Sequence, residues 1–268
     1  MSTPVPNTEE ELLAKATSLH GRTLGEISNT INLSVPPDQL KNKGFVGELI
    51  ESYVGVSKKN KNLPIPDFEN LGIELKTIPV IDGRPTESTH VCSAALKRNA
   101  GEQWKNSRVF RKLEKVLWVP IQADTKIRLS ERVVGRAFLW SPSAEDERIL
   151  RSDWEEHMEL IILGRFAELH GERGEYLQIR PKGRNSNSKG LSTSELGEPT
   201  ITQPRGFYLR QSFTEKIKII VKKIKPKTPN SQSNFDFNIA KKTTENRITV
   251  AISFQTLIKK EEYLNESL

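Results

Sequence analysis

The chain has a single cysteine, Cys92, among its 268 residues. One cysteine excludes an internal disulfide and a zinc site built from several cysteines, so we expect Cys92 to be a small buried side chain. The four histidines show no spacing typical of metal ligands; they are His20, His90, His157 and His170. This scatter gives no support to a histidine-metal nuclease or to a Ser-His-Asp hydrolase.

Long hydrophobic segments are also absent. No run of 18 apolar residues occurs, and the first residues, MSTPVPNTEEE, have neither the basic start nor the apolar centre of a signal peptide. We therefore expect a soluble, cytoplasmic protein without a membrane partner.

The residues that are present indicate a globular protein with an excess of positive charge. Hydrophobic residues make up 35% of the chain, which includes four tryptophans and ten phenylalanines. This length can bury the core of one domain or of two closely joined lobes. The net charge of +7 favours a polyanionic partner, but it does not separate DNA from RNA or from an anionic membrane.

The stretch from residue 63 to 80 contains the most informative pattern. Apolar or small residues occupy alternate positions, as in a half-buried strand, at Leu71, Ile73, Leu75 and Thr77. Glu74 and Lys76 then share the opposite face. Asp67 precedes the strand and follows two prolines, so a turn could bring its carboxylate beside that of Glu74.

Two carboxylates and an ammonium at this spacing suit a metal-dependent phosphodiesterase. Carboxylate oxygens are ligands for Mg²⁺, and Lys76 could orient the attacking water, or deprotonate it if the site lowers the pKa of Lys76. An exposed strand face that carries Glu and Lys is also an ordinary solvated surface. The spacing alone therefore leaves both interpretations open.

Capping patterns and hydrophobic periodicity outline the remaining elements. Three capping boxes predict helix starts, at Thr8 with Glu11, Thr23 with Glu26, and Ser143 with Asp146. The predicted helices cover residues 8–19, 23–31, 38–55 and 143–170, with a short helix before Lys112 and a basic helix after Leu209. The predicted strands cover 89–95, 115–121, 133–140, 176–179, 235–239 and 248–254. Three or four strands beside the acidic pair predict one mixed sheet.

Two further features have both a structural and a functional interpretation. Glu51 lies at the edge of the apolar face of its predicted helix, where a carboxylate is either solvated or able to reach a metal. After the basic run Arg180-Pro181-Lys182, a loop rich in Gly, Ser and Asn is either a solvated connection or a groove-facing segment.

Six blocks of sequence, in order over about residues 8 to 224, resemble the MutH family of DNA mismatch repair endonucleases. The blocks are KGFVGELIESYVG, DFENLGIELKTIPV, LEKVLWVPI, LWSPSAEDERILRSDWEE, GEYLQIRPK and PRGFYL. The resemblance implies a mixed α/β, type II restriction endonuclease-like fold, with a central mixed sheet flanked by helices and two lobes around a DNA cleft. It places the endonuclease domain at 1–224, a linker at 225–234 and a C-terminal extension of unknown role, with an expected strand, at 235–268.

The resemblance also implies a function. Proteins of this family nick the unmethylated strand of hemimethylated GATC sites in double-stranded DNA during mismatch repair. The expected cofactor is Mg²⁺, with Mn²⁺ as a possible substitute, the expected activator is MutL, and the expected state is a monomer.

The family's site residues can be placed on this sequence one by one. Asp67, Glu74 and Lys76 match the catalytic triad, Glu51 matches a helix glutamate beside the metal, and Lys112 matches a lysine near the active site. The implied metal ligands are Asp67, Glu74 and Glu51. The implied DNA-binding residues are Lys43, Arg180, Pro181, Lys182 and the methylation-sensing tyrosine, Tyr208.

Several alternatives stay open at this stage. A GATC-specific restriction enzyme that makes double-strand breaks would share these residues, and a non-catalytic DNA-binding module would keep the same fold and basic surface. The sequence does not decide the number of metal ions, the identity of the base, or whether Lys112 acts in chemistry or contacts phosphate. The residues from 226 onward could form an interaction strand or a passive appendage.

Overall fold

The computed structural model describes residues 4–37, 44–56, 65–97, 101–182, 188–194 and 196–217. The chain divides into two units, Met1–Pro226 and Lys227–Leu268, and every described residue belongs to the first. Lys43 and the strands expected at 235–239 and 248–254 lie outside the described residues. The domain boundaries at 224 and 234 therefore stay predictions.

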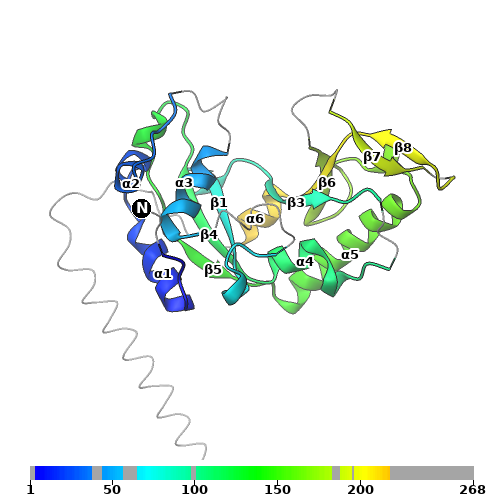
Figure 1. Ribbon diagram of the computed structural model, residues 1–268, viewed down its shortest axis with the longest axis horizontal. Coiled ribbons are helices and arrows are strands. Elements are labelled where there is room, and N and C mark those ends of the chain that lie inside the picture. The colour runs from blue at the N-terminus through cyan, green and yellow to red at the C-terminus, as the bar shows by residue number, and fades with distance from the viewer. Residues whose placement is uncertain are drawn as a thin grey trace, which may run out of the picture. The chain divides into compact units, whose positions relative to one another are not determined.

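Figure 1 shows the helices, three of which begin where the capping residues predict. Thr23 and Ser143 form complete capping boxes, whereas at the first helix Thr8 caps Glu11 N and the Glu11 carboxylate accepts from Asn7 N. The α-helices are α1 (Glu9–Ser18), α2 (Leu24–Thr30), α3 (Phe45–Val54), α4 (Arg108–Leu113), α5 (Ala144–Ile162) and α6 (Gln211–Lys216). The 3-10 helices are η2 (Glu69–Leu71), η3 (Trp104–Asn106), η4 (Leu129–Glu131) and η5 (Phe166–Glu168). In this described part of the chain, no helix has both the length and the apolarity to cross a bilayer.

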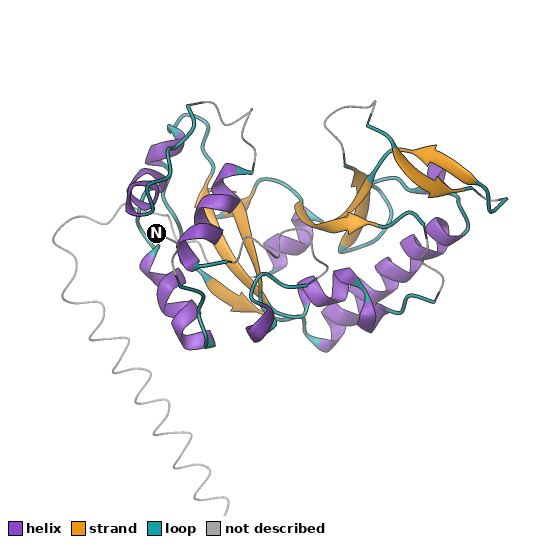
Figure 2. Ribbon diagram, viewed as in Figure 1, coloured by secondary structure: helices purple, strands orange, loops and turns teal. Residues whose placement is uncertain are grey.

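The strands form three separate sheets (Figure 2). They are β1 (Glu74–Ile81), β2 (Arg84–Pro85), β3 (Thr89–Ala94), β4 (Val116–Gln122), β5 (Phe138–Trp140), β6 (Leu177–Pro181), β7 (Gly190–Thr193), β8 (Pro199–Thr202) and β9 (Arg205–Leu209). The sheet orders are β2-β1-β4-β5, β3-β9-β6 and β7-β8. The first sheet is mixed, because β1 and β4 run parallel while its other pairs are antiparallel.

A tight turn joins β1 to β2 where the Asp82-Gly83 pair predicts it. Both residues have positive φ, 49° for Asp82 and 78° for Gly83. Two consecutive residues of positive φ are typical of a type I′ hairpin turn, whose twist matches that of the flanking strands.

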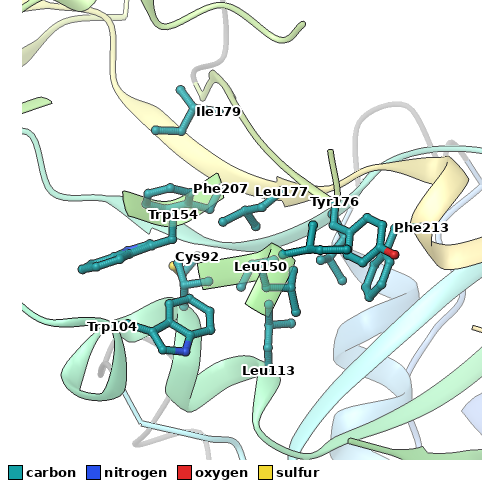
Figure 3. Close-up of a cluster of buried hydrophobic side chains, with 14 of the residues drawn as sticks. Cys92, Trp104, Leu113, Leu150, Trp154, Tyr176, Leu177, Ile179, Phe207 and Phe213 are labelled. Carbon is teal, nitrogen blue, oxygen red and sulfur yellow. The ribbon is translucent and has the colours of Figure 1, made fainter. Parts of the chain in front are cut away.

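Two hydrophobic cores fix the mixed sheet between helices. On one face, Leu75 of β1 and Leu117 of β4 pack with residues of α1, α2 and α3. On the other face, Ile78 of β1 and Trp118 of β4 belong to a core that includes residues of α4, α5 and the β3-β9-β6 sheet. Figure 3 shows part of this second core, with Trp104, Trp154, Leu150, Phe207, Tyr176 and Phe213. Cys92 is buried there as a free thiol, as expected.

Three predictions about strands were wrong. Leu71 belongs to the 3-10 helix η2 instead of β1. Of residues 133–140 only the last three form β5, and Val133 and Val134 form isolated bridges. The strand near residue 89 does not join the mixed sheet. It pairs with β9, because its apolar side chains complete the core under α5.

Two predictions further along the chain were also wrong. The long helix ends at Ile162, well before His170, since Gly164 adopts a φ of 72° that breaks the helical backbone. No strand was predicted directly after the loop at 183–190, but the β7-β8 hairpin lies there, in which Leu191 pairs with Ile201.

Candidate active site

The turn before β1 folds Asp67 against the first residues of the strand. Asp67 Oδ2 accepts a hydrogen bond of 3.0 Å from Leu75 N, and Asp67 N donates one of 3.2 Å to Glu74 Oε2. Reciprocal hydrogen bonds between Phe68 and Ile73 close the same turn. The two acidic residues separated by six positions in the sequence therefore lie together.

Glu74 is buried between two lysines. Only 2% of the residue is exposed, and its two carboxylate oxygens accept hydrogen bonds from different ammonium groups. Lys76 Nζ lies 2.5 Å from Oε1, and Lys112 Nζ, from α4, lies 2.7 Å from Oε2. Both lysine side chains keep some exposure, at 15% and 13%. Glu74 is thus not a solvated surface charge, and Lys112 joins the constellation from a distant part of the sequence.

The charges of these groups adjust one another's protonation. Burial raises the pKa of Asp67 to about 6, and the neighbouring charge of Glu74 acts in the same direction. Burial also acts to raise the pKa of Glu74, but the ammonium groups of Lys76 and Lys112 outweigh it and lower that pKa. Burial acts to lower the pKa of Lys76, and the charges of Glu74 and Asp67 outweigh it and raise the pKa. Glu74 is therefore an anion and Lys76 a hydrogen-bond donor at neutral pH.

The acidic pair provides suitable ligands for a hard divalent cation. Mg²⁺ binds through one or two carboxylates and keeps several waters, which fits two adjacent carboxylates. The raised pKa of Asp67 reflects burial together with nearby negative charge, and a bound cation would offset both.

Glu51 reaches β1 from α3 without completing a metal cluster. The Glu51 carboxylate and the Thr77 hydroxyl both lie beside Gly47 of α3. A Cβ added to Gly47 would be 3.8 Å from Glu51 Oε1 and 3.8 Å from Thr77 Oγ1. Thr77 alternates with Lys76 along the strand, so the two side chains point to opposite faces. Within the described ranges, no three or more His, Cys, Asp or Glu side chains are grouped to hold a metal. The role of Glu51 as a ligand stays a prediction.

Three of the expected DNA-binding residues, Tyr208, Arg180 and Lys182, lie on one face of the β3-β9-β6 sheet, whereas Pro181 alternates with Arg180 and belongs to the other face. Tyr208 on β9 lies opposite His90 on β3 and Gln178 on β6. The Arg180 guanidinium lies over the Tyr208 ring, 5.8 Å from its centroid. Lys182 follows Pro181, the last residue of β6. Its Nζ donates a hydrogen bond of 2.7 Å to Ser93 Oγ. The opposite face of this sheet packs into the core under α5.

Burial adjusts the donors of this polar face. It raises the pKa of Tyr208, so the hydroxyl keeps its proton, and it lowers the pKa of Lys182. The face therefore presents the guanidinium of Arg180 and the hydroxyl of Tyr208 as hydrogen-bond donors.

Sequence reasoning gave no role to three residues around these sites. His90 contacts the Tyr208 ring, Gly206 lies under both side chains, and Asp153 on α5 accepts hydrogen bonds from the backbone that leads into β6. The strand alternation near residue 89 contained a signal for His90, but the pairing of β3 with β9 was needed to place it beside Tyr208.

Comparisons with known proteins identify the family of this chain. The family model described as "DNA mismatch repair enzyme MutH" matches residues 56–153. The chain is 49% identical over 213 residues to the DNA mismatch repair protein MutH of Haemophilus ducreyi. The matched region covers 79% of this chain and 93% of that protein. The chain is 46% identical over 215 residues to the Vibrio cholerae protein of the same name, with 80% and 96% covered. The chain belongs to the MutH family.

Membership in the MutH family establishes the general activity. The chain is a DNA mismatch repair endonuclease, a hydrolase that acts on phosphodiester bonds and depends on a divalent metal. It binds DNA and interacts with other components of the repair machinery. A relative from Escherichia coli strain K12 / DH10B, also named DNA mismatch repair protein MutH, is 47% identical over 210 residues, which are 78% of this chain and 91% of that protein.

Proposed function

We propose that this MutH-family enzyme nicks the unmethylated strand at hemimethylated GATC sites, with Mg²⁺ as its cofactor and Mn²⁺ as a substitute. The observation that carries the proposal is the buried Glu74 carboxylate, held beside Asp67 and between two ammonium groups. A site of this kind combines oxygen ligands for a cation with donors for a charged phosphate.

Each residue of the site receives a distinct role. Asp67 and Glu74 would hold the cation, and the family resemblance alone assigns Glu51 on α3 as a further ligand. When bound, a divalent cation polarises the scissile phosphate and stabilises its developing negative charge. Lys76 Nζ orients the attacking water and donates to a non-bridging phosphate oxygen, a role that suits an ammonium whose pKa is raised.

Lys112 keeps Glu74 ionised and adds positive charge from α4. Its Nζ donates to the same oxygen, Glu74 Oε2, that accepts from Asp67 N. A second ammonium here stabilises the carboxylate form that would hold a cation, and it provides a further hydrogen-bond donor for a charged phosphate.

Recognition of the site is assigned to the polar face of the β3-β9-β6 sheet. Adenine N6 lies in the major groove, where a methyl group changes both its shape and its donor pattern. Tyr208, with Arg180, Pro181 and Lys182 along β6, would contact that groove. Lys43 is assigned a DNA contact from the family resemblance alone. Each bidentate base contact gives about 1–3 kcal/mol of discrimination, so a four-base site needs several.

The proposal extends to the surroundings of the enzyme. Two lobes would enclose the duplex, MutL would activate the monomer, and the reaction would take place in the bacterial cytoplasm, where the chromosome is replicated. These assignments rest on the family resemblance, and the relatives support the mismatch repair context by their name.

Matched duplexes that are unmethylated, hemimethylated and fully methylated at one GATC site test the function, each with and without MutL. We expect Mg²⁺-dependent nicks in unmethylated strands only, and faster nicking with MutL. Efficient double-strand cleavage without MutL would support a restriction enzyme instead. Tight binding without cleavage in Mg²⁺ or Mn²⁺ would contradict the proposed reaction.

A further inference from the structure

His90 lies beside the proposed methylation sensor. The imidazole and the Tyr208 ring meet edge to face, with their centroids 5.0 Å apart and their planes at 65°. The pairing of β3 with β9 shifts register between His90 and Cys92, at the position of Val91. Such a bulge re-aims side chains. Here it keeps His90 on the polar face while Cys92 packs into the core.

Gly206 provides the space in which the two rings meet. A Cβ at this position would lie 3.2 Å from Tyr208 Cε2 and 3.3 Å from His90 Nε2, closer than most real Cβ contacts. It would also lie 3.3 Å from the carbonyl oxygen of Cys92, which is backbone and cannot swing away. The absence of a side chain therefore lets both rings approach the sheet. The contact with His90 then limits the positions that the Tyr208 ring can take.

The His90 ring is a neutral, confined group. Its Nε2 is buried and has no hydrogen-bond partner among the residues that the structure describes. Burial lowers the pKa of His90 to about 4, and the positive charges of Lys182, Lys76 and Lys112 act in the same direction against the opposite effect of Glu74. The same ring thus lies within the electrostatic range of both the acidic site and the polar face.

We propose that His90 is a positioning residue for Tyr208. By packing edge to face above Gly206, it fixes the orientation in which the tyrosine ring meets the adenine, and so contributes to the discrimination against methylated DNA. This inference rests on the proposed function of Tyr208. A purely structural role would predict that loss of the His90 ring lowers the melting temperature. A positioning role predicts that this loss lowers the ratio of the two nicking rates, with a melting temperature close to that of the wild type.

The test measures nicking of each strand of a hemimethylated GATC duplex by the full chain in Mg²⁺, together with the melting temperature of each variant. The readout is the ratio of the rate on the unmethylated strand to the rate on the methylated strand. An aromatic pair of this kind is expected to change that ratio about three- to tenfold, so His90→Ala should lower it by this factor. His90→Phe keeps an aromatic edge and should retain a ratio within about twofold of the wild type.

A double-mutant cycle tests whether His90 acts through Tyr208. In a Tyr208→Ala background, His90→Ala should change the ratio no further. His170→Ala, at an exposed histidine of the same chain, is the matched control and should leave the ratio unchanged.

Three results would overturn the inference. They are an unchanged ratio in His90→Ala, including an equal fall of both rates, a fall in His90→Phe as large as that in His90→Ala, or a further change of the ratio by His90→Ala in the Tyr208→Ala background. Wild-type protein that nicks both strands equally, or neither, would instead contradict the proposed function and the inference with it.

Discussion

Glu74 and Asp67 lie side by side, yet their environments act on them in opposite directions. Glu74 is compensated by two ammonium groups, and its pKa is lowered. Asp67 accepts a backbone hydrogen bond from Leu75 N and faces the charge of Glu74, and its pKa is raised to about 6. Two neighbouring carboxylates with pKa values moved apart are typical of sites with assigned chemical roles.

This difference predicts the effect of Asp67→Asn on stability. Since the folded pKa of about 6 exceeds the ordinary value of 3.8, the stability that Asp67 contributes is present below pH 4 and is lost as the pH rises through 6. The asparagine does not ionise, so the variant should gain on the wild type across this window, by an amount on the order of 2–3 kcal/mol. Urea unfolding from pH 4 to 7 in a chelator measures the difference, and added Mg²⁺ should reduce it. A difference that stayed constant with pH would refute the assigned cause.

The residues of the site differ in how far the sequence could predict them. Asp67, Glu74 and Lys76 are close in the chain, so strand alternation and a proline-led turn suffice to bring them together. Lys112 is distant in sequence from Glu74 and depends on the packing of α4, which no local pattern encodes. His90 is local to a predicted strand, but its neighbour Tyr208 belongs to a strand more than a hundred residues later.

At the scale of elements, α5 holds the strand that carries the proposed base-reading residues. The Asp153 carboxylate accepts hydrogen bonds from three successive backbone amides, of Glu175, Tyr176 and Leu177, at 2.8, 2.7 and 2.8 Å. The Arg210 guanidinium donates to carbonyl oxygens in the same turn, those of Gly171, Arg173 and Gly174. The segment that leads into β6 is thus fixed through both amides and carbonyls of its backbone.

Asp153→Ala is therefore expected to destabilise the fold. It leaves three amides without their acceptor, two of them on buried residues, and should lower the free energy of unfolding by about 3 kcal/mol. Chemical denaturation measures this loss. Glu159→Ala, at an exposed position of the same helix, is the matched control and should change stability by less than about 0.5 kcal/mol. Equal effects of the two substitutions would show that the amide contacts contribute nothing.

The elements show where sequence patterns were sufficient and where they were not. The starts of α1, α2 and α5 were predicted well, because a capping residue acts within one turn of the chain, whereas the helix expected from residue 38 begins at Phe45. The end of α5 was misplaced, since the apolar stripe continues through Phe166 although Gly164 leaves the helix. The β7-β8 hairpin was missed because its Gly, Ser and Thr residues have the composition of a loop.

At the scale of the whole molecule, the net charge of +7 and the basic residues of β6 should make DNA binding strongly dependent on salt. Each phosphate contact contributes a slope of about −0.9 to the logarithm of affinity against the logarithm of salt concentration. If Lys182 contacts phosphate, Lys182→Ala should make the slope less negative by about 0.9, the value for one contact. Arg148→Ala, at an exposed ion pair on α5, should leave the slope unchanged. Binding titrations at several salt concentrations without divalent metal measure both slopes, and equal slopes would exclude a phosphate contact of Lys182.

The order of the blocks along the chain predicted the family, because six matched segments specify more than any single motif. The division into one mixed sheet and a second, three-stranded sheet was not predicted. It depends on the return of β9 between β3 and β6, a pairing over more than a hundred residues that local periodicity does not encode.

The central claim is that the buried Glu74 carboxylate is required for hydrolysis of DNA. Its most direct test compares single-turnover nicking of an unmethylated GATC duplex in Mg²⁺ by the wild type, Glu74→Gln and Glu74→Asp, with melting temperatures measured in parallel. We expect Glu74→Gln to bind DNA but to nick at least about a hundredfold more slowly, and Glu74→Asp, which keeps the charge, to retain more activity. A folded Glu74→Gln variant that nicked within about threefold of the wild-type rate would contradict the claim.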